Sequence, residues 1–424
     1  METDSIVLSA TERAMLAGDE GPGVQKAMEI VVALGRIYGA QQLVPVGSVQ
    51  VAGVSYKNLG EAGLEFLAEW ADQGARVRVP TTLNPAGMDL SRWQALGFDP
   101  AFADRQNAVI RAFSQMGVRT TCTCTPYLIG NRPGLGEHLA WAESSAVSFA
   151  NSVIGARTNR EGGPSALAAA ITGRTAAYGL HLDQQRRATL QVEVRCSVRE
   201  TSDYGALGYL VGRAAQNRVP FFRGLKVTAE EQLKALGAAL AASGAVALYH
   251  VDGVTPEAVA GADVLASESE FMVIDSIAPG YSALSSARAG DESSEVRPHE
   301  GWGAPIDLVW IGCPHASLGE MERVATLLRG RKVRSALWIT AAREVRQAAV
   351  EVGLVAALEA CGAQVVADTC VVVAPMRELG FRNMATPSGK GAYYGPSHAG
   401  LAVHYGTLAA CIESAVEGRW TPSN

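Results

Sequence analysis

The sequence predicts an α/β protein with parallel strands, divided into more than one sub-domain. Short β-branched segments alternate with longer segments whose apolar residues recur at helical spacing, which is typical of βα units. The chain has 424 residues, more than one small domain usually holds, and 48% of them are hydrophobic, enough to fill several cores. Its 45 glycines indicate many tight turns between the elements.

In the first half of the chain, helix and strand patterns follow one another closely. A helix begins at Thr11 and is interrupted by the glycine-rich residues 18–23. Apolar spacing and β-branched content predict the remaining elements. The predicted helices span residues 24–38, 64–73, 104–116 and 136–148, and the predicted strands span residues 42–51, 76–80 and 119–123.

The second half repeats this alternation. The predicted helices span residues 229–242, 256–261, 318–329 and 343–358, and the predicted strands span residues 246–249, 307–311, 335–340 and 363–366. A charged, Ser- and Gly-rich stretch at residues 289–303 is expected to be a surface loop or an inter-domain connection. We place the boundary between two α/β sub-domains near Val219-Pro220, which divides the chain into residues 1–219 and 220–424.

Charge and hydropathy narrow the class of protein. The 36 basic and 42 acidic residues give a net charge of −6, which argues against a nucleic-acid partner. No apolar run is long enough to span a membrane, and the first residues lack a signal-peptide pattern, so we expect a cytoplasmic protein. Seven cysteines are too few for a disulfide scaffold, so we expect buried thiols, metal ligands or nucleophiles.

Three cysteines stand in polar turns marked by Pro, Gly or Thr, each after a predicted strand: Cys124, Cys313 and Cys370. Because loops at the carboxyl ends of parallel strands share one crevice, their sulfurs can converge. Three thiolates without a fourth favour an iron–sulfur cluster with an open iron. Cys122 would lie on the same strand face as Cys124, so either could be a ligand.

The residues alone leave other interpretations of these cysteines open. A zinc site could add His315, which follows Cys313-Pro314, as its fourth ligand. A catalytic thiol and simple burial also fit, because the chain has no CxxC pair. The other three cysteines have mainly structural settings: Cys196, Cys361 and Cys411.

Further polar loops could line a ligand site. Gly53-Val54-Ser55 follows the strand at 42–51, and Asn84-Pro85 follows the strand at 76–80. Each taken alone is also a plain turn. Glu143-Ser144 leads into a polar stretch at residues 151–164, which is either a pocket wall or a solvated helix face. Lys390 stands between two glycines and could reach an anion, although the segment is not a phosphate-binding P-loop.

Together these segments resemble the large, cluster-binding subunit of the aconitase X family, over nearly the whole chain. The resemblance rests on Thr123-Cys124-Thr125-Pro126-Tyr127, Glu143-Ser144-Ser145-Ala146-Val147, Phe149-Ala150-Asn151-Ser152, residues 155–164, Gly312-Cys313-Pro314-His315 and Ser388-Gly389-Lys390. It implies aconitase-like α/β/α sub-domains with parallel-rich sheets around a central cleft, without the small swivel domain.

The resemblance also implies a set of site residues. Cys124, Cys313 and Cys370 would bind the iron–sulfur cluster, whether 2Fe–2S, 3Fe–4S or 4Fe–4S. The substrate would contact Gly53, Val54, Ser55, Asn84, Pro85, Glu143, Ser144 and Lys390, of which Glu143 and Lys390 would also be catalytic. A separate small swivel subunit would bring the serine that acts as base, so the chain alone should turn over poorly.

The activity implied is the dehydration of a small hydroxy acid. One substrate of the family is cis-3-hydroxy-L-proline, which gives Δ1-pyrroline-2-carboxylate, and another is mevalonate 5-phosphate. The Ala-rich, Lys-poor composition favours the hydroxyproline dehydratases of bacteria. A phosphorylated substrate would require cations beyond Lys390, such as Arg157 and Arg160, which could equally be ion-pair partners. An alternative of another class is a cluster- or zinc-binding protein without catalysis.

Overall fold

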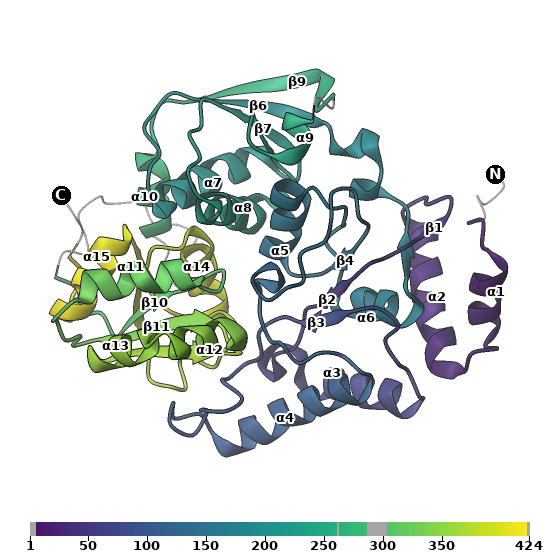
Figure 1. Ribbon diagram of the computed structural model, residues 1–424, viewed down its shortest axis with the longest axis horizontal. Helices are drawn as coiled ribbons and strands as arrows, with labels where there is room; N and C mark the ends of the chain where they lie inside the picture. The colour runs from purple at the N-terminus through teal and green to yellow at the C-terminus, as the bar shows by residue number, and fades with distance from the viewer. Residues whose placement is uncertain (1–5, 261–262, 286–302, 422–424) are drawn as a thin grey trace.

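Three parallel sheets and one antiparallel strand pair organise the described part of the chain (Figure 1). The computed structural model describes residues 6–260, 263–285 and 303–421. The predicted α/β class with parallel-rich sheets is confirmed. We call the parallel sheets the first, second and third sheet, in the order in which the chain forms them.

The first sheet is small and has the strand order β3-β2-β4, all parallel. Its strands are β2 (Val49–Val51), β3 (Thr81–Leu83) and β4 (Ala140–Trp141), and β1 (Leu43–Pro45) pairs antiparallel with β5 (Arg174–Ala176) beside it. The helices of this part are α1 (Ala10–Ala17), α2 (Pro22–Ile37), α3 (Tyr56–Asp72), α4 (Pro100–Gln115), α5 (Ser144–Phe149) and α6 (Gly163–Thr172). Short helical turns follow at η1 (Pro126–Leu128), η2 (Ala150–Ile154), η3 (Gly179–His181) and η4 (Asp183–Arg186).

The second sheet has the order β8-β7-β6-β9 and is also parallel. Its strands are β6 (Ala188–Val194), β7 (Pro220–Arg223), β8 (His250–Val251) and β9 (Leu265–Ile274), and its helices are α7 (Thr201–Ala215), α8 (Glu230–Gly244), α9 (Pro256–Val259) and α10 (Ala278–Ser285). The helices α7 and α8 approach so closely that a Cβ at Gly244 would lie 1.9 Å from the Gly212 carbonyl oxygen. Glycine is therefore required at this crossing.

The third sheet has the order β12-β11-β10-β13-β14. Its strands are β10 (Leu308–Ile311), β11 (Ala336–Ala341), β12 (Ala363–Ala367), β13 (Asn383–Thr386) and β14 (Ala402–Tyr405). Its helical elements are α11 (Leu318–Leu328), α12 (Arg343–Glu351), α13 (Leu354–Ala360), α14 (Gly389–Tyr394), η5 (Gly395–Ala399) and α15 (Leu408–Glu417). The chain adds β11 and β12 on one side of β10, and β13 and β14 on the other. The order therefore reverses between β10 and β13, where α/β sheets usually bind ligands.

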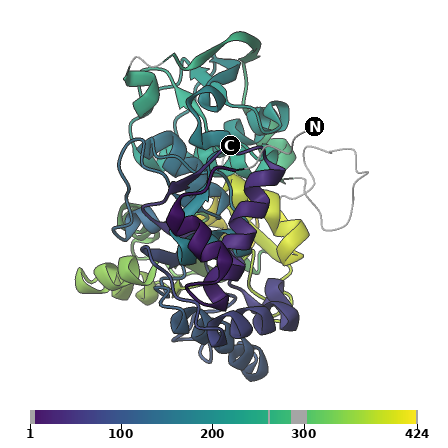
Figure 2. The ribbon, with the colours of Figure 1, turned by 90° about the vertical axis from the view of Figure 1, so that its right-hand side faces the viewer.

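The helix α8 joins the three parts of the molecule, because it packs against α7, α5 and α14. In Figure 1, α5 and α8 lie centrally, between the first sheet and the third sheet with its helices. Turned by 90°, the N-terminal helices α1 and α2 face the viewer, in front of these central elements (Figure 2). A short, buried helix such as α5 is thus held by tertiary packing, since six residues alone do not form a stable helix.

Several predicted elements of the first half are wrong in extent. Residues 42–51 form two strands in different sheets, because Gly47-Ser48 separates β1 from β2. Residues 76–80 were predicted as a strand but do not form one. The strand β3 begins directly after them, at Thr81, in residues that were predicted as a loop. Of residues 119–123 only Arg119 pairs, in an isolated bridge with Thr82. Strands of two or three fully buried residues carry no alternating pattern, so periodicity does not locate them.

Two predicted helices are also corrected. Residues 136–148 contain β4 before α5, and residues 343–358 form two helices that meet at Gly353, whose φ is +74°. The charged stretch predicted at 289–303 lies, apart from residue 303, outside the described residues. The division of the chain at residue 219 stays a prediction.

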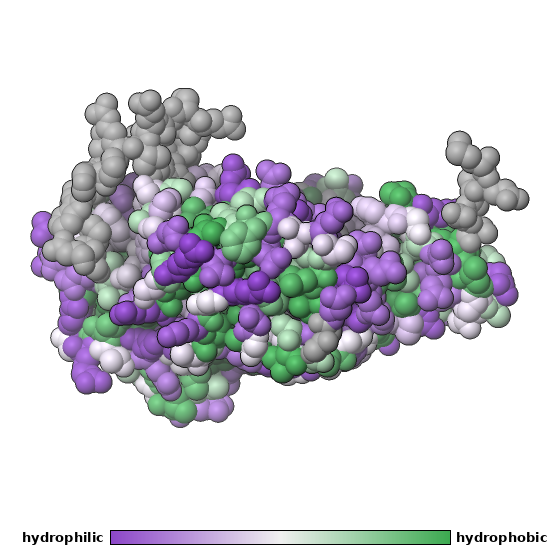
Figure 3. Space-filling view, turned by 90° about the horizontal axis from the view of Figure 1, so that it is seen from above, coloured by the Kyte–Doolittle hydropathy of each residue, from purple (hydrophilic) through white to green (hydrophobic). Residues whose placement is uncertain are grey.

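Among the described residues, no helix has the length and apolar character needed to cross a membrane. On the face drawn in Figure 3, hydrophobic residues are interspersed with hydrophilic ones. The large apolar side chains are instead collected in cores between sheets and helices, such as Trp70, Trp141 and Trp310, which are fully buried.

Candidate active site and cysteine cluster

Two carboxyl edges of parallel sheets meet at the candidate site. In the first sheet, Gly53–Ser55 follow β2, Asn84-Pro85 follow β3 and Glu143-Ser144 follow β4. In the third sheet, Cys313 follows β10, Cys370 follows β12 and Lys390 follows β13. Ala86 N donates to the Asp368 carbonyl oxygen at 2.7 Å, and Ser55 Oγ donates to the Val373 carbonyl oxygen at 2.8 Å. Residues that are about 250 to 320 positions apart in sequence thus share one site.

The reversal of strand order in the third sheet brings Cys313 beside Lys390. Cys313 follows β10 and Ser388 follows the neighbouring strand β13, and Ser388 Oγ donates to the Cys313 carbonyl oxygen. The same Ser388 oxygen accepts from Gly391 N at 2.9 Å and so caps α14, where Lys390 is the second residue. One serine therefore fixes both the cysteine loop and the helix that presents the lysine.

Lys390 and Glu143 form an ion pair across the two edges. Both side chains are buried, with residue exposures of 8% and 6%. Lys390 Nζ donates to Glu143 Oε1, and also to Ser144 Oγ and Ser145 Oγ at 3.1 Å each, so all three ammonium protons are used. Glu143 is the N-cap of α5 and accepts from Ala146 N at 2.7 Å and from Ser145 Oγ at 2.6 Å.

The pair keeps both groups charged despite their burial. Burial opposes the ionisation of Glu143, but Lys390 and the hydrogen bonds from Ser145 and Ala146 outweigh it and lower the pKa of Glu143. Burial likewise opposes the charge on Lys390, but Glu143, Cys313 and Cys124 outweigh it and raise the pKa of Lys390. A fixed ammonium group at neutral pH suits the binding of an anion.

The predicted cysteines come together beside this pair. The thiols of Cys313 and Cys370 form a hydrogen bond with each other, and Cys124 Sγ accepts from His315 N at 3.2 Å. Burial raises the pKa of Cys124 to about 12, with Glu143 adding to the rise. For Cys313, burial opposes ionisation, but the Cys370 hydrogen bond and Lys390 outweigh it and lower the pKa. Lys390 and the backbone N–H of His315 favour thiolates. Burial opposes them by raising the pKa of Cys124, and the neighbouring Cys313, together with burial, raises the pKa of Cys370.

Cys122 lies apart from this group. Its φ is +44°, so residues 121–124 are not a regular strand, and the prediction that Cys122 and Cys124 share a strand face is wrong. The Cys122 thiol lies near Ala86 and Asp368, and burial raises its pKa well above the ordinary value. The kinked backbone therefore separates the two thiols.

The donor set suits a cluster better than a single ion. No group of three or more His, Cys, Asp or Glu side chains is arranged to hold a metal ion within residues 6–260, 263–285 and 303–421. Cys313 lies beside both Cys370 and Cys124, since the thiols of each pair shift one another's pKa. Cysteine thiolates are the usual ligands of iron–sulfur clusters, so the three residues fit a cluster.

His315 is not positioned as a zinc ligand. Its Nδ1 is 2.9 Å from Thr123 Oγ1, and its Nε2 is 2.9 Å from the Thr369 carbonyl oxygen, so both ring nitrogens are already bonded. Burial lowers the pKa of His315 to about 4, and the ring is neutral at pH 7. A fourth zinc ligand from this side chain would require both hydrogen bonds to break.

The predicted substrate loops line the same edge. Gly53 has a φ of +77°, which favours glycine, and Val54, Ser55 and Pro85 are buried. Asn84 N donates to the Val51 carbonyl oxygen at 2.9 Å, while Asn84 Oδ1 is buried without a hydrogen-bond partner among the described residues. An orphaned amide oxygen at a strand end suits a polar ligand.

Sequence reasoning missed several polar residues of this site. Thr123 and Thr369 are fully buried neighbours of cysteines, and Ser145 and Ser388 bind the ion pair and the Cys313 loop. Their only sequence signal is position, directly beside a residue already singled out. Arg157, considered for a phosphate site or an ion pair, pairs with Asp183.

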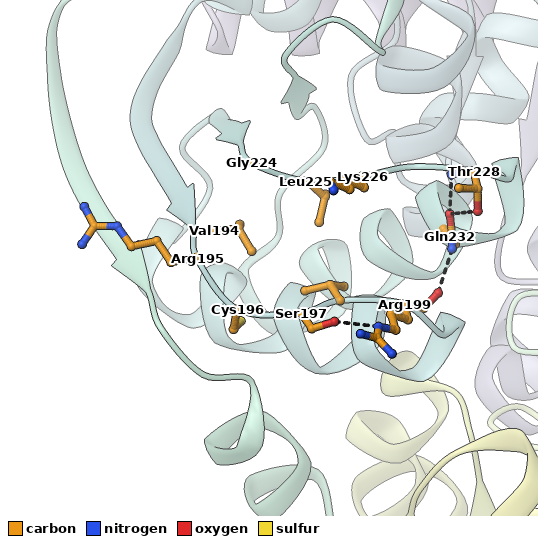
Figure 4. Close-up of a pocket in the computed structure, with 11 residues that line it drawn as sticks. Val194, Arg195, Cys196, Ser197, Arg199, Gly224, Leu225, Lys226, Thr228 and Gln232 are labelled. Atoms are coloured by element: carbon orange, nitrogen blue, oxygen red, sulfur yellow. Dashed lines mark hydrogen bonds between the residues drawn. The ribbon is translucent and has the colours of Figure 1, made fainter.

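A separate cavity of about 510 Å³ opens at the carboxyl ends of β6 and β7 in the second sheet (Figure 4). Arg195, Arg199 and Lys226 line it together with Cys196, and none of the predicted site residues does so. In Figure 4 the Arg195 side chain points away from the other lining residues, and Arg199 Nε donates to Ser197 Oγ at 2.8 Å.

Comparison with known proteins agrees with this architecture. Family models for the aconitase X first, second and third domains match residues 5–184, 188–278 and 306–417. The crystal structure of Thermococcus kodakaraensis aconitase X in its holo-form is 45% identical, with a TM-score of 0.86, and the match covers 97% of this chain and 100% of that one.

Two curated relatives differ in their named substrates. The phosphomevalonate dehydratase large subunit of Methanothermobacter thermautotrophicus is 50% identical over 94% of this chain and 96% of its own length. The cis-3-hydroxy-L-proline dehydratase of Pseudomonas aeruginosa is 39% identical over 97% of this chain and 70% of its own length.

The hydroxyproline prediction is therefore wrong. Four phosphomevalonate dehydratase large subunits are 44–50% identical to this chain, against 35–39% for the hydroxyproline enzymes. The error arose because an Ala-rich, Lys-poor composition reports on a genome and not on a binding site. The relatives in both identity ranges, 44–50% and 35–39%, are dehydratases, and the three domain matches span most of the sequence. The chain is a hydro-lyase that belongs to the aconitase X family.

Proposed function

We propose that this chain is the large subunit of a phosphomevalonate dehydratase. The observation that carries the proposal is the identity of 44–50% to four large subunits of that name, each aligned over more than nine-tenths of this chain. The Lys390–Glu143 pair and the three neighbouring thiols support a site for an anionic hydroxy acid at the meeting of the two sheet edges.

The reaction removes water from mevalonate 5-phosphate. The C–H bond next to the carboxylate breaks and its proton passes to a base. Its electron pair forms the new C=C bond as the C–O bond to the β-hydroxyl breaks, and the hydroxide leaves with a proton as water. Charge develops on the carboxylate side of the substrate, so fixed donors there accelerate the step.

Lys390, Ser144 and Ser145 would bind the substrate carboxylate. All three protons of Lys390 Nζ are engaged in the free chain, so an incoming carboxylate would replace one of these partners. Asn84 Oδ1 would accept a hydrogen bond from a substrate hydroxyl, since this buried oxygen has no partner among the described residues. Backbone N–H groups of residues 53–55 would complete the contact.

Glu143 would keep Lys390 protonated and oriented. Its carboxylate is fixed by the α5 N-terminus through Ala146 N, at 2.7 Å, so the lysine is held from a rigid element. Glu143 could also move a proton to or from the substrate through Ser144 or Ser145.

Cys124, Cys313 and Cys370 would hold an iron–sulfur cluster. When bound, such a cluster supplies an iron atom that acts as a Lewis acid toward the departing hydroxyl. Cys124 is buried while Cys313 and Cys370 are partly exposed, and Lys390 would balance the negative charge of Cys313 and Cys124. The number of irons stays open.

A small subunit would complete the site. The phosphomevalonate dehydratase relatives are called large subunits, and the hydroxyproline dehydratase of Pseudomonas aeruginosa has further length that this chain does not match. We propose that the partner is a swivel-domain protein whose serine serves as the base, so that the proton-accepting group comes from outside this chain.

The test is a dehydration assay of the anaerobically purified complex with its small subunit. Mevalonate 5-phosphate, cis-3-hydroxy-L-proline and citrate are offered side by side, and iron and sulfide are measured in the same sample. We expect turnover of mevalonate 5-phosphate alone. Turnover of either other acid in its place would refute the substrate, and an iron-loaded complex inactive on all three would favour a binding protein.

A further inference from the structure

We propose that His315 is a positioning residue that locks the three cysteine loops to one another through a single imidazole ring. The inference rests on the proposed function only in taking Cys124, Cys313 and Cys370 as cluster ligands. His315 lies two residues after Cys313 and is fully buried. Its partners are residues 123 and 369, which are the immediate neighbours of the other two cysteines.

The hydrogen bonds fix the ring completely. The Thr369 carbonyl oxygen can only accept, so Nε2 carries the proton and donates to it at 2.9 Å. Nδ1 forms the second hydrogen bond of the ring, with Thr123 Oγ1 at 2.9 Å. Thr123 Oγ1 accepts in turn from Thr125 N at 3.1 Å, which ties the ring to the backbone on the far side of Cys124.

The backbone of His315 adds two further links. His315 N donates to Cys124 Sγ at 3.2 Å, and the His315 carbonyl oxygen accepts from Lys234 Nζ at 3.2 Å. Lys234 belongs to α8, the helix that packs against both neighbouring parts of the molecule. The residue therefore connects a loop beside the first sheet, two loops of the third sheet and the central helix.

This arrangement differs from that of an ordinary core histidine. The buried His250 uses Nε2 to bind the Arg186 carbonyl oxygen at 2.9 Å, while its Nδ1 has no partner among the described residues. Replacing the His250 side chain removes one hydrogen bond, to Arg186, whereas replacing the His315 side chain removes both bonds that join it to the residues beside Cys124 and Cys370. Hydrogen-bonding partners of this kind commonly change metal affinity 10- to 100-fold.

The first experiment needs no cluster. Hydrogen–deuterium exchange is measured on the reduced, cluster-free full chain for the wild type, His315→Ala, His315→Gln and the matched control His250→Gln. We expect His315→Ala to lose protection in residues 121–127, 312–316 and 367–371 at once. The control should leave these segments unchanged. Exchange that rises only around residue 315 would overturn the proposal.

The second experiment measures iron retention by the reconstituted chain against a chelator under anaerobic conditions. We expect iron to be lost about 10- to 100-fold faster from His315→Ala, and less so from His315→Gln, which keeps one bond. Thr123→Val removes one of the two hydrogen bonds of the ring, together with the two bonds between Thr123 Oγ1 and Thr125, and should also be intermediate. Iron loss equal to that of the wild type in these variants would refute the inference.

The two experiments separate the positioning role from the proposed function. If the wild type binds no iron, the cluster assignment fails, while the exchange data still decide whether His315 links the loops. If His315→Ala does not fold, His315→Gln and Thr123→Val carry both measurements, because each removes individual hydrogen bonds without opening a large cavity.

Discussion

The second sheet and the two sheets that meet at the candidate site have the same local design, yet only the latter carry the predicted chemistry. All three are parallel, and polar loops follow their strands. The edge of the second sheet opens into a cavity that exposes Arg195, whose side chain is 58% exposed. The edges of the first and third sheets face each other and bury Lys390 and Glu143 to 8% and 6% exposure.

The carboxyl edge of one parallel sheet is enough to position polar loops. A second edge that faces it removes their charged side chains from water. The Lys390–Glu143 attraction is strong because both groups are removed from water. The exposed Arg195–Glu193 pair, with a separation of 4.0 Å, is screened by solvent. Opposed edges also bring together thiols that lie far apart in the chain.

The largest contrast is expected for cysteines on the two kinds of edge. Replacing Cys313 by Ser removes a proposed cluster ligand, so iron content and the visible absorption of the anaerobically purified chain should fall to background. Turnover by the complex should fall by at least about 100-fold. Cys196→Ser, at the cavity of the second sheet, should change neither. A wild-type iron content in Cys313→Ser would show that this thiol is not a ligand.

The next effect concerns the buried ion pair. Lys390→Met leaves the Glu143 carboxylate buried without its cation, which should lower the free energy of unfolding by about 3–5 kcal/mol. The double variant Lys390→Met, Glu143→Gln should regain most of this loss. Urea unfolding measures both, and an equal loss in the single and double variants would contradict the coupling.

The pH dependence of this pair follows from its pKa shifts. The pKa of Glu143 is lowered, so its stabilisation is present above the unfolded-state value of about 4.3 and is lost as pH falls through the folded value. The pKa of Lys390 is raised, so its stabilisation is lost only as pH rises through a value above about 10.4. The stabilisation that the pair gives the wild type should therefore stay constant from about pH 5 to 9. In Lys390→Met, burial without the cation should raise the pKa of Glu143, so the variant should lose stability as pH rises from about 4.3 to the folded-state pKa of this carboxyl. Urea unfolding of both proteins at several pH values measures this, and a stability of Lys390→Met that does not change with pH would contradict it.

Smaller effects are expected for two asparagines, Asn84 beside the proposed substrate and Asn151 in the folded core. Asn84→Ala should raise the KM for mevalonate 5-phosphate about tenfold with little change in Tm, because Asn84 Oδ1 has no hydrogen-bond partner among the residues that the structure describes. Asn151 uses both ends of its amide, so Asn151→Ala should cost about 3 kcal/mol of stability. A large Tm loss in Asn84→Ala would assign this residue to the fold.

The smallest effects are expected at the cavity of the second sheet. Arg199→Ala and Lys226→Ala change exposed cations, so kcat/KM should stay within about twofold and stability within about 0.5 kcal/mol. The steady-state kinetics of the complex check this. A tenfold loss in either variant would make this edge part of the active site.

Much of the architecture was predictable because long elements leave a periodic trace. The predicted helix at 24–38 corresponds to α2, that at 104–116 to α4 and that at 318–329 to α11. The strands β2, β3 and β4 have only two or three residues each and lie in the buried core, so their limits followed no pattern. The loops after them were nevertheless recognised by residue type.

The sequence by itself determined the α/β class, the family and the polar loops beside Cys124, Cys313 and Cys370, because turn chemistry and motifs are local. Only the tertiary structure decided that Cys122 lies apart, that Lys390 meets Glu143, and that His315 binds residues beside two distant cysteines. These contacts join residues up to 247 positions apart. They depend on which sheet edges face each other, and that relation is set by the packing of α5, α8 and α14.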